Sequence, residues 1–239
     1  VFLPFLFSRL PALDRELPAR RGAFDALPCV RIKGGPAARL HVTAPPFVGA
    51  GEPVRLHLAA VDRYGNLDED FRGTVRLTGG RGFKGLPDSV RFQPRHGGCR
   101  EVTGVRAAGT GWHTVRAAGA SVEGVSNQVC ISKEPPAERL FFGEIHAHTL
   151  DGDGTTTPAE HYAYARRVAG LDFGAVSSHM EYFNGKAAWD RYVEAATAAH
   201  TPGRFVTFYG YEWAGEGHTN AYFQRPEDAV CLYGKRILK

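Results

Sequence analysis

Histidine and carboxylate side chains follow the ends of three predicted strands in the second half of the sequence. His146 and His148 close the first strand, His179 follows the second, and Glu212 ends the third. Residues i and i+2 of a strand face the same side, so both imidazoles of the first pair can reach one ion. The carboxylate of Asp153 follows in the next loop. The spacing predicts a site for divalent metal ions with mixed imidazole and carboxylate ligands.

The loop Asp151-Gly-Asp153-Gly154 also resembles the start of a calcium-binding loop. An EF-hand requires glycine at its sixth position and glutamate at its twelfth, where this sequence has Thr156 and Tyr162. The sequence has no G-x-S-x-G elbow, no H-E-x-x-H pair and no glycine-rich phosphate loop, and its four cysteines show no C-x-x-C spacing. These absences argue against a serine hydrolase, a zincin, a P-loop enzyme and a cysteine zinc site.

The elements that must position these side chains alternate between strand and helix. Helix 158–170 has a clear start, because Thr157, Pro158 and Glu160 form a capping box with proline at the first helical position. Such alternation indicates parallel strands joined by right-handed crossovers, with sites at the carboxyl ends of the strands. The expected strands are 140–147, 172–177, 205–211 and 219–223, and the second expected helix is 186–200.

The first half of the sequence has period two. In Val54-Arg-Leu56-His-Leu58 the apolar residues alternate with polar ones, as on a half-buried antiparallel strand, and glycine-rich turns separate such runs. This pattern predicts an immunoglobulin-like β-sandwich. The proline pair in residues 133–139 indicates a linker. The expected organisation is an N-terminal extension 1–34, a sandwich 35–132, the linker 133–139 and a second domain 140–239 that carries the predicted metal site.

Four blocks carry a family resemblance: Leu140-Phe-Phe-Gly-Glu-Ile-His146-Ala-His148-Thr, Asp153-Gly-Thr-Thr-Thr-Pro158, Ala169-Gly-Leu-Asp-Phe-Gly-Ala-Val-Ser-Ser-His179 and Gly210-Tyr-Glu212-Trp. They resemble the PHP (polymerase and histidinol phosphatase) superfamily, in particular a branch of bacterial proteins with a β-sandwich before the PHP domain. The resemblance covers roughly residue 35 to the end. It implies an α/β fold in which the sandwich is followed by the first part of a distorted (β/α)7 barrel.

The resemblance also implies two or three divalent ions (zinc, manganese or iron) and hydrolysis of phosphoester or other ester bonds by a metal-bound hydroxide. Glu212 would bridge two ions and position the nucleophile, and His179 would complete coordination and polarise the leaving group, so these two are the expected catalytic residues. On the same pattern the expected metal ligands are His146, His148, Asp153, His179, Glu212 and His218.

Three departures from the family pattern leave alternatives open. Ser178 stands where the family commonly has aspartate before the second-motif histidine, and Glu144 stands where the first motif has aspartate. The family's later ligands are expected beyond Lys239, which suggests a chain cut within the PHP domain. The alternatives are therefore a non-catalytic metal-binding or adhesion-type protein, or an inactive fragment of an enzyme.

Composition limits the partners. The net charge of +4 comes from dispersed arginines rather than a basic groove, and no segment approaches the roughly 20 apolar residues of a membrane span. The expected partner is a small ester or phosphoester substrate, without nucleic acid or membrane.

Lys186 and Arg204 are interpreted as solvated charges, with contact to an anionic substrate as the alternative. A cytoplasmic location is favoured, with a periplasmic or secreted one left open. The sandwich is interpreted as shaping the site entrance, with a binding module as the alternative.

Overall fold

The computed structural model describes residues 33–183, 185–215, 217–233 and 236–237. The predicted N-terminal extension, residues 1–34, lies almost entirely outside these ranges. Residues Gly34–Lys239 group into one unit by their contacts. The division of this unit into a sandwich, a linker and a hydrolase domain stays a prediction.

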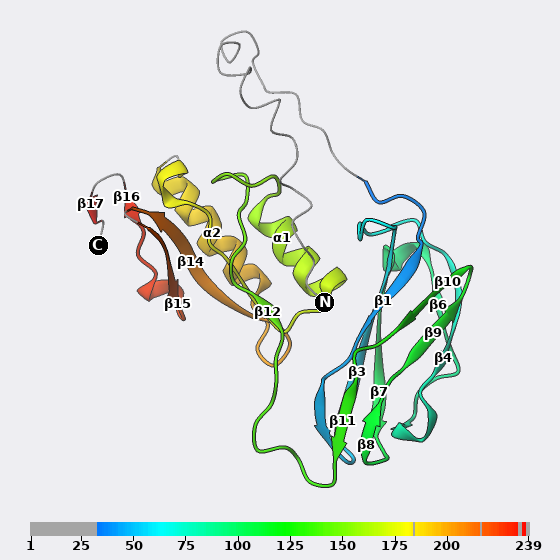
Figure 1. Cartoon of the computed structure of the whole chain (residues 1–239). Coiled ribbons are helices and arrows are strands. Elements are labelled where there is room, and N and C mark those ends of the chain that lie inside the picture. Colours follow the sequence, from blue (N-terminus) through cyan, green and yellow to red (C-terminus); the bar gives the residue numbers. More distant parts are fainter. Residues whose placement is uncertain (1–32, 184, 216, 234–235, 238–239) are drawn as a thin grey trace. The chain divides into compact units, whose positions relative to one another are not determined.

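Short antiparallel strands dominate the first half of the described chain (Figure 1). One sheet has the order β1-β3-β7-β5, a second β10-β9-β4-β6, and a third β2-β11-β8. The strands are β1 (Arg39–Thr43), β2 (Phe47–Gly49), β3 (Pro53–Val61), β4 (Gly73–Thr78), β5 (Phe83–Lys84), β6 (Ser89–Phe92), β7 (Cys99–Ala107), β8 (Gly111–His113), β9 (Arg116–Gly119), β10 (Val122–Val125) and β11 (Val129–Ser132), with short helices η2 (Gly80–Gly82) and η3 (Pro94–His96).

The period-two pattern of the sequence produces the core of this half. Val54, Leu56 and Leu58 on β3 are buried, whereas Arg55 between them is exposed. Alternate residues of a strand face opposite sides of the sheet, so each strand contributes one apolar face. The buried faces form one apolar cluster in a β-sandwich-like arrangement.

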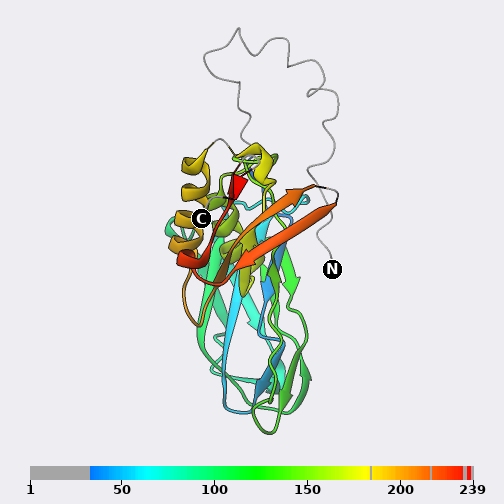
Figure 2. The ribbon, with the colours of Figure 1, turned by 90° about the vertical axis from the view of Figure 1, so that its left-hand side faces the viewer.

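A separate four-stranded sheet carries the second half, in the order β12-β13-β14-β15. Neighbours β12, β13 and β14 are parallel, and β15 is antiparallel to β14. Figure 2 shows β14 and β15 as the paired orange strands. The elements are β12 (Gly143–Glu144), α1 (Pro158–Tyr164), η4 (Ala165–Ala169), β13 (Phe173–Val176), η5 (Met180–Tyr182), α2 (Lys186–Ala199), β14 (Val206–Ala214), β15 (His218–Phe223), η6 (Pro226–Asp228), β16 (Leu232–Tyr233) and β17 (Arg236–Ile237).

The predicted fold class, α/β with the first part of a distorted (β/α)7 barrel, is wrong. Among the described residues 40% are in strands and only 19% in helices. The strand expected at 219–223 returns antiparallel directly after β14, without the crossover helix that a parallel strand requires. The strand expected at 140–147 is reduced to Gly143–Glu144. The described sheet is therefore open and mixed, with β12 and β15 at its edges.

The helices begin where the sequence signals them. The Thr157 hydroxyl accepts from Glu160 N–H and the Glu160 carboxylate accepts from Thr157 N–H, which completes the capping box of α1. Gly170 ends the following helical turn in the left-handed region, at φ 67°. Helix α2 buries Trp189 and Tyr192 in the second apolar cluster. None of the described helices has the length and apolar character needed to cross a membrane.

Candidate metal centre

The carboxyl ends of the three parallel strands lie together, as the strand pattern predicts. His146 and His148 follow β12, and Glu212 lies on β14. His179 follows β13 and forms a parallel bridge with Glu212, which places both residues at the same edge of the sheet. Although the first two histidines lie beyond the end of the short β12, their rings stack with centroids 5.3 Å apart. These two predicted ligands thus come from a loop and not from the strand end that was expected, although they lie together as predicted.

Glu212 is the centre of the cluster and is almost completely buried, with 1% of its surface exposed. Its Oε2 atom lies 3.0 Å from His146 Nε2, 2.8 Å from His148 Nε2 and 3.7 Å from His179 Nε2. Its Oε1 atom lies 2.6 Å from His218 Nδ1. One buried carboxylate therefore faces four imidazoles.

Asp153 joins the cluster from the following loop. Its Oδ1 atom lies 2.5 Å from His148 Nδ1, and its Oδ2 atom lies 3.8 Å from His179 Nε2. The structure therefore brings all six predicted ligands together. Their nitrogen and oxygen atoms form three overlapping groups, in each of which all donor atoms lie within 4.8 Å of one another: His146, His148 and Glu212; His148, Asp153 and His179; His179, Glu212 and His218.

This donor set fits divalent metal ions. Two ligands that each lie about 2.1 Å from one tetrahedral ion are about 3.4 Å apart, close to the separations of His179 Nε2 from the two carboxylates. Imidazole and carboxylate ligands suit zinc, manganese and iron alike. The His179 ring lies centrally, with centroids 4.8 Å from His148 and 4.9 Å from His218. The cluster could hold a metal ion, and the identity of that ion is not fixed by these ligands.

The electrostatics favour an ionised carboxylate at the centre. Burial raises the pKa of Glu212, but hydrogen bonds from His146 and His218 and the neighbouring imidazoles outweigh this effect, so the pKa lies below its ordinary value. The side chains of His146 and His218 are 50% and 64% exposed. The cluster thus combines a charged, buried centre with two exposed imidazoles.

Two further carboxylates lie next to the predicted ligands. Glu144 Oε1 accepts the backbone N–H of His146 at 2.6 Å. Glu181 Oε2 lies 3.9 Å from His179 Nδ1, a buried atom that has no hydrogen-bond partner among the described residues, and Glu181 Oε1 accepts the N–H of Ala214 at 2.9 Å. Carboxylates at the second imidazole nitrogen orient histidine ligands. Glu181 was not among the predicted site residues, although its position two residues after His179 was the available signal.

Two glycines flank Asp153 and allow the loop 149–154 to fold tightly. A Cβ atom on Gly154 would lie 2.1 Å from the carbonyl oxygen of His148, and one on Gly152 would lie 2.5 Å from Ser178 Cβ. Both separations are too short for any side chain. The two glycines therefore let the loop place Asp153 close to His148.

We expect Gly154→Ala to displace this loop and weaken metal binding by about 10-fold or more, the scale of losses seen when ligand support is removed. The matched control is Gly217→Ala, which lies next to His218 but has no atom within 4 Å of the added Cβ. Titration with Zn²⁺ by calorimetry measures the difference. Equal affinities of the two variants would show that the loop tolerates the shift.

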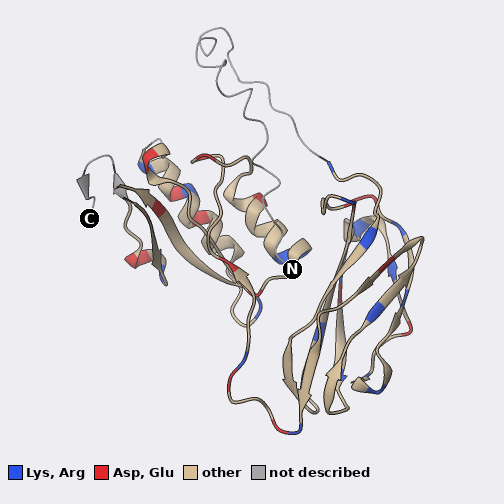
Figure 3. Ribbon diagram, viewed as in Figure 1, with Lys and Arg blue, Asp and Glu red and all other residues tan. Residues whose placement is uncertain are grey.

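The two cations singled out in the sequence contact carboxylates rather than the ligand cluster. Lys186 Nζ lies 2.6 Å from Asp190, one helical turn along α2. Arg204 forms an ion pair with Glu101. Figure 3 shows Lys and Arg on many separate elements. Their interpretation as charges outside the site agrees with these contacts.

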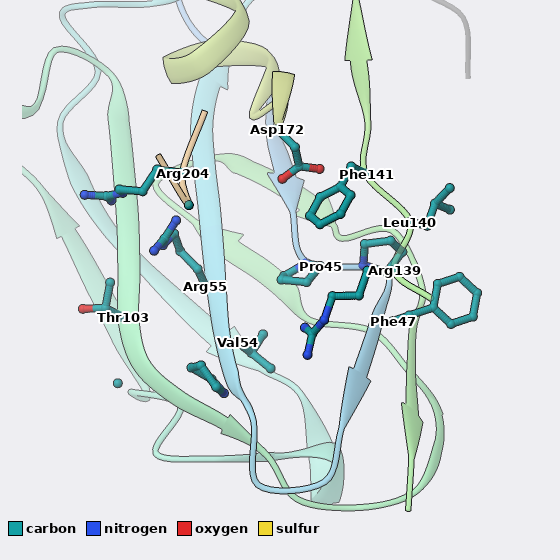
Figure 4. A pocket seen from close by; sticks show the side chains of 14 residues that line it. Pro45, Phe47, Val54, Arg55, Thr103, Arg139, Leu140, Phe141, Asp172 and Arg204 are labelled. Carbon is teal, nitrogen blue, oxygen red and sulfur yellow. The ribbon is translucent and has the colours of Figure 1, made fainter. Parts of the chain in front are cut away.

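A cavity of about 300 Å³ lies away from the ligands and includes residues that precede β13 and β14 (Figure 4). Its charged lining includes Arg55, Arg139, Asp172 and Arg204. Each arginine has a glutamate partner: Arg55 and Arg204 contact Glu101, and Arg139 contacts Glu52. This neutralised cavity contains none of the predicted metal ligands.

A family model described as "Protein of unknown function (DUF3604)" matches residues 160–225. The match includes His179, Glu212 and His218 but not His146, His148 or Asp153. Because it covers less than half of the chain, no family assignment follows from it. No curated protein is significantly similar to this chain.

Similar solved structures are distant. A glycosyl hydrolase family 2 member from Bacteroides cellulosilyticus is 14% identical with a TM-score of 0.37, over 42% of this chain and 15% of its own. A carbohydrate acetylesterase from Xanthomonas citri is 12% identical with a TM-score of 0.26, over 52% of this chain and 23% of its own. The sulfur carrier protein SoxY from Chlorobium limicola is 17% identical with a TM-score of 0.28, over 50% of this chain and 96% of its own. The chain thus spans less than a quarter of the length of the two hydrolases. TM-scores this low do not show a shared fold or function.

Proposed function

We propose that this chain carries the metal site of a hydrolase that cleaves phosphoester or other ester bonds. The observation that supports the proposal is the convergence of His146, His148, His179 and His218 on the buried carboxylate of Glu212, with Asp153 beside two of these imidazoles, at the carboxyl ends of parallel strands. Parallel sheets commonly place active sites at this edge. The resemblance of the sequence motifs to the PHP superfamily belongs to the same proposal and supplies the reaction class.

Bound divalent ions would supply Lewis acidity and lower the pKa of a coordinated water. The residues of the chain supply the arrangement. Glu212 accepts hydrogen bonds from His146 at one oxygen and from His218 at the other, so it holds rings from two elements toward the same point. His179 completes the donor set from β13. Glu212 and His179, the predicted catalytic residues, are the central pair of this proposed site.

The charge of the site bears on the substrate class. Glu144 and Glu181 lie next to predicted ligands, and the side chains of Lys186 and Arg204 contact other carboxylates. Neutralisation of an anionic substrate would therefore depend on the metal ions, whereas a neutral ester would need no further cation. Phosphomonoesters, phosphodiesters and carboxyl esters are the substrates to compare.

Metal content and hydrolysis test the proposal together. The full chain, purified without chelators, is expected to hold about two transition-metal ions when its metal content is measured by plasma mass spectrometry. This is the number of ions in a two-metal hydrolase. The double variant His146→Ala, His148→Ala should lose them, and His113→Ala, on β8, should not. Hydrolysis by the wild type that is absent from the double variant would support the hydrolase. A wild type with bound metal and no activity on any ester would favour a non-catalytic metal-binding protein, and a folded wild type without metal would overturn the proposal.

A further inference from the structure

Three hydroxyl groups meet in the core directly behind the ligand cluster. Thr149 and Ser178 are completely buried, and Tyr192 is 4% exposed. The backbone N–H of Thr149 donates to Ser178 Oγ at 2.8 Å, and Tyr192 Oη donates to the same oxygen. Thr149 Oγ1 lies 2.5 Å from Tyr192 Oη. Each of these three residues thus contacts the other two.

The three residues come from three separate elements, and two of them are neighbours of predicted ligands. Thr149 directly follows His148, and Ser178 directly precedes His179. Tyr192 lies on the buried face of α2 and reaches both of these residues. The hydroxyl cluster therefore joins the loop that carries one ligand to the strand end that carries another.

The loop has further contacts with Thr149 and with α2. The Thr149 carbonyl accepts the N–H groups of Gly152 and Gly154, on either side of Asp153, at 2.9 and 3.0 Å. Arg191, next to Tyr192 on α2, forms an ion pair with Asp151. Helix α2 thus holds the loop at two points, one buried and one at the surface.

Tyr192 is suited to a permanent donor role. Burial raises the pKa of its phenol to about 12, so the hydroxyl keeps its proton throughout the physiological range. A buried donor of this kind finds its partner in the fold rather than in water. The alternative, a hydroxyl cluster that stabilises only the core, would leave metal binding unchanged when one hydroxyl is removed.

We propose that Thr149, Ser178 and Tyr192 are positioning residues of the metal centre, which set the separation of His148 and Asp153 from His179. The inference rests on the proposed metal site. Groups that hydrogen-bond a metal ligand directly are typically worth 10–100-fold in metal affinity, and these three residues act one step further out, on the backbone next to His148 and His179. On this proposal α2 contributes to metal binding through Tyr192, although α2 carries none of the predicted ligands.

Two matched pairs of variants test this role. Thr149→Val keeps the shape of the side chain and removes its hydroxyl, whereas Thr149→Ser keeps the hydroxyl. Tyr192→Phe removes one buried phenol hydroxyl, and Tyr209→Phe removes another, which lies 3.2 Å from Thr197 Oγ1 and contacts no predicted ligand. Both pairs use the full chain, with circular dichroism to confirm that each variant folds.

The probe is Co²⁺, titrated into chelator-treated protein and followed by its visible absorption, which reports ligand geometry as well as affinity. Thr149→Val and Tyr192→Phe are expected to weaken binding by about 10-fold or more and to change the spectrum, whereas Thr149→Ser and Tyr209→Phe should stay within about twofold of wild type. If Thr149→Val does not fold, Tyr192→Phe decides. Equal affinities and spectra within each pair would overturn the positioning role while leaving the metal site intact. A wild type that binds no Co²⁺ would overturn both the site and this inference.

Discussion

Replacing Glu212 by glutamine is expected to lower the affinity of the chain for Zn²⁺ by more than about 100-fold, beyond the usual effect of an outer partner. The substitution keeps the size of the side chain and removes its charge. The carboxylate of Glu212 belongs to two of the three groups of donor atoms, so the substitution removes the negative charge from both. Only the group of His148, Asp153 and His179 keeps its carboxylate. A residual weak site at His148, Asp153 and His179 is the expected remainder.

Stability in the presence of metal measures this loss without any substrate. A ligand present at 100 times its Kd stabilises the native state by about 2.7 kcal/mol, so Zn²⁺ should raise the Tm of wild type and leave that of Glu212→Gln nearly unchanged. Glu194→Gln, an exposed substitution on α2, is the control and should respond like wild type. An equal Zn²⁺-dependent rise in Glu212→Gln would show that the central carboxylate is not a ligand.

The position of the ligands was predictable because it depends on a local rule. Parallel strands end at one edge of a sheet, so His179 after β13 and Glu212 on β14 had to lie close together once both strands were identified. The pair His146 and His148 was placed correctly for a reason that only partly holds, since β12 ends at Glu144. Chain connectivity, rather than strand periodicity, brings these two rings to the site.

The prediction of the fold class was wrong because the fold class depends on residues far apart in the sequence. Nothing in the run 219–223 distinguishes a strand that returns antiparallel from one that awaits a crossover helix, because both have the same alternation. The short connection after Ala214 decides it, since a parallel partner would need a dozen or more connecting residues. The barrel was inferred from the resemblance alone, and the described sheet is open with an antiparallel edge strand.

Tyr192 shows a further limit of pattern reasoning. Its spacing with Trp189 predicts a buried helix face, and both side chains are buried. Periodicity cannot say that the hydroxyl of this core residue reaches Ser178 beside a predicted ligand. The polar atom of an amphipathic aromatic residue needs a partner when buried, and only the tertiary structure identifies that partner.

The second large effect is expected in the second apolar cluster, at the amino end of β14. Phe205 directly precedes β14 and is completely buried. Its ring lies edge-on to Tyr162 of α1, with centroids 6.3 Å apart, and a Cβ atom on Gly174 of β13 would lie 3.2 Å from its Cζ atom. The ring therefore fills the space between the first helix and the strand that leads to His179.

Phe205→Ala should lower the free energy of unfolding by about 3–5 kcal/mol, because it removes a buried aromatic ring and leaves a cavity between packed elements. That is a large share of the roughly 5–15 kcal/mol that stabilises a typical domain. Val206→Ala, one residue along and 37% exposed, is the control and should cost less than about 1 kcal/mol. Urea unfolding of metal-free protein measures both. Similar losses in the two variants would mean that the ring contributes little to this core, and the packing of α1 on β13 would then have to depend on other side chains.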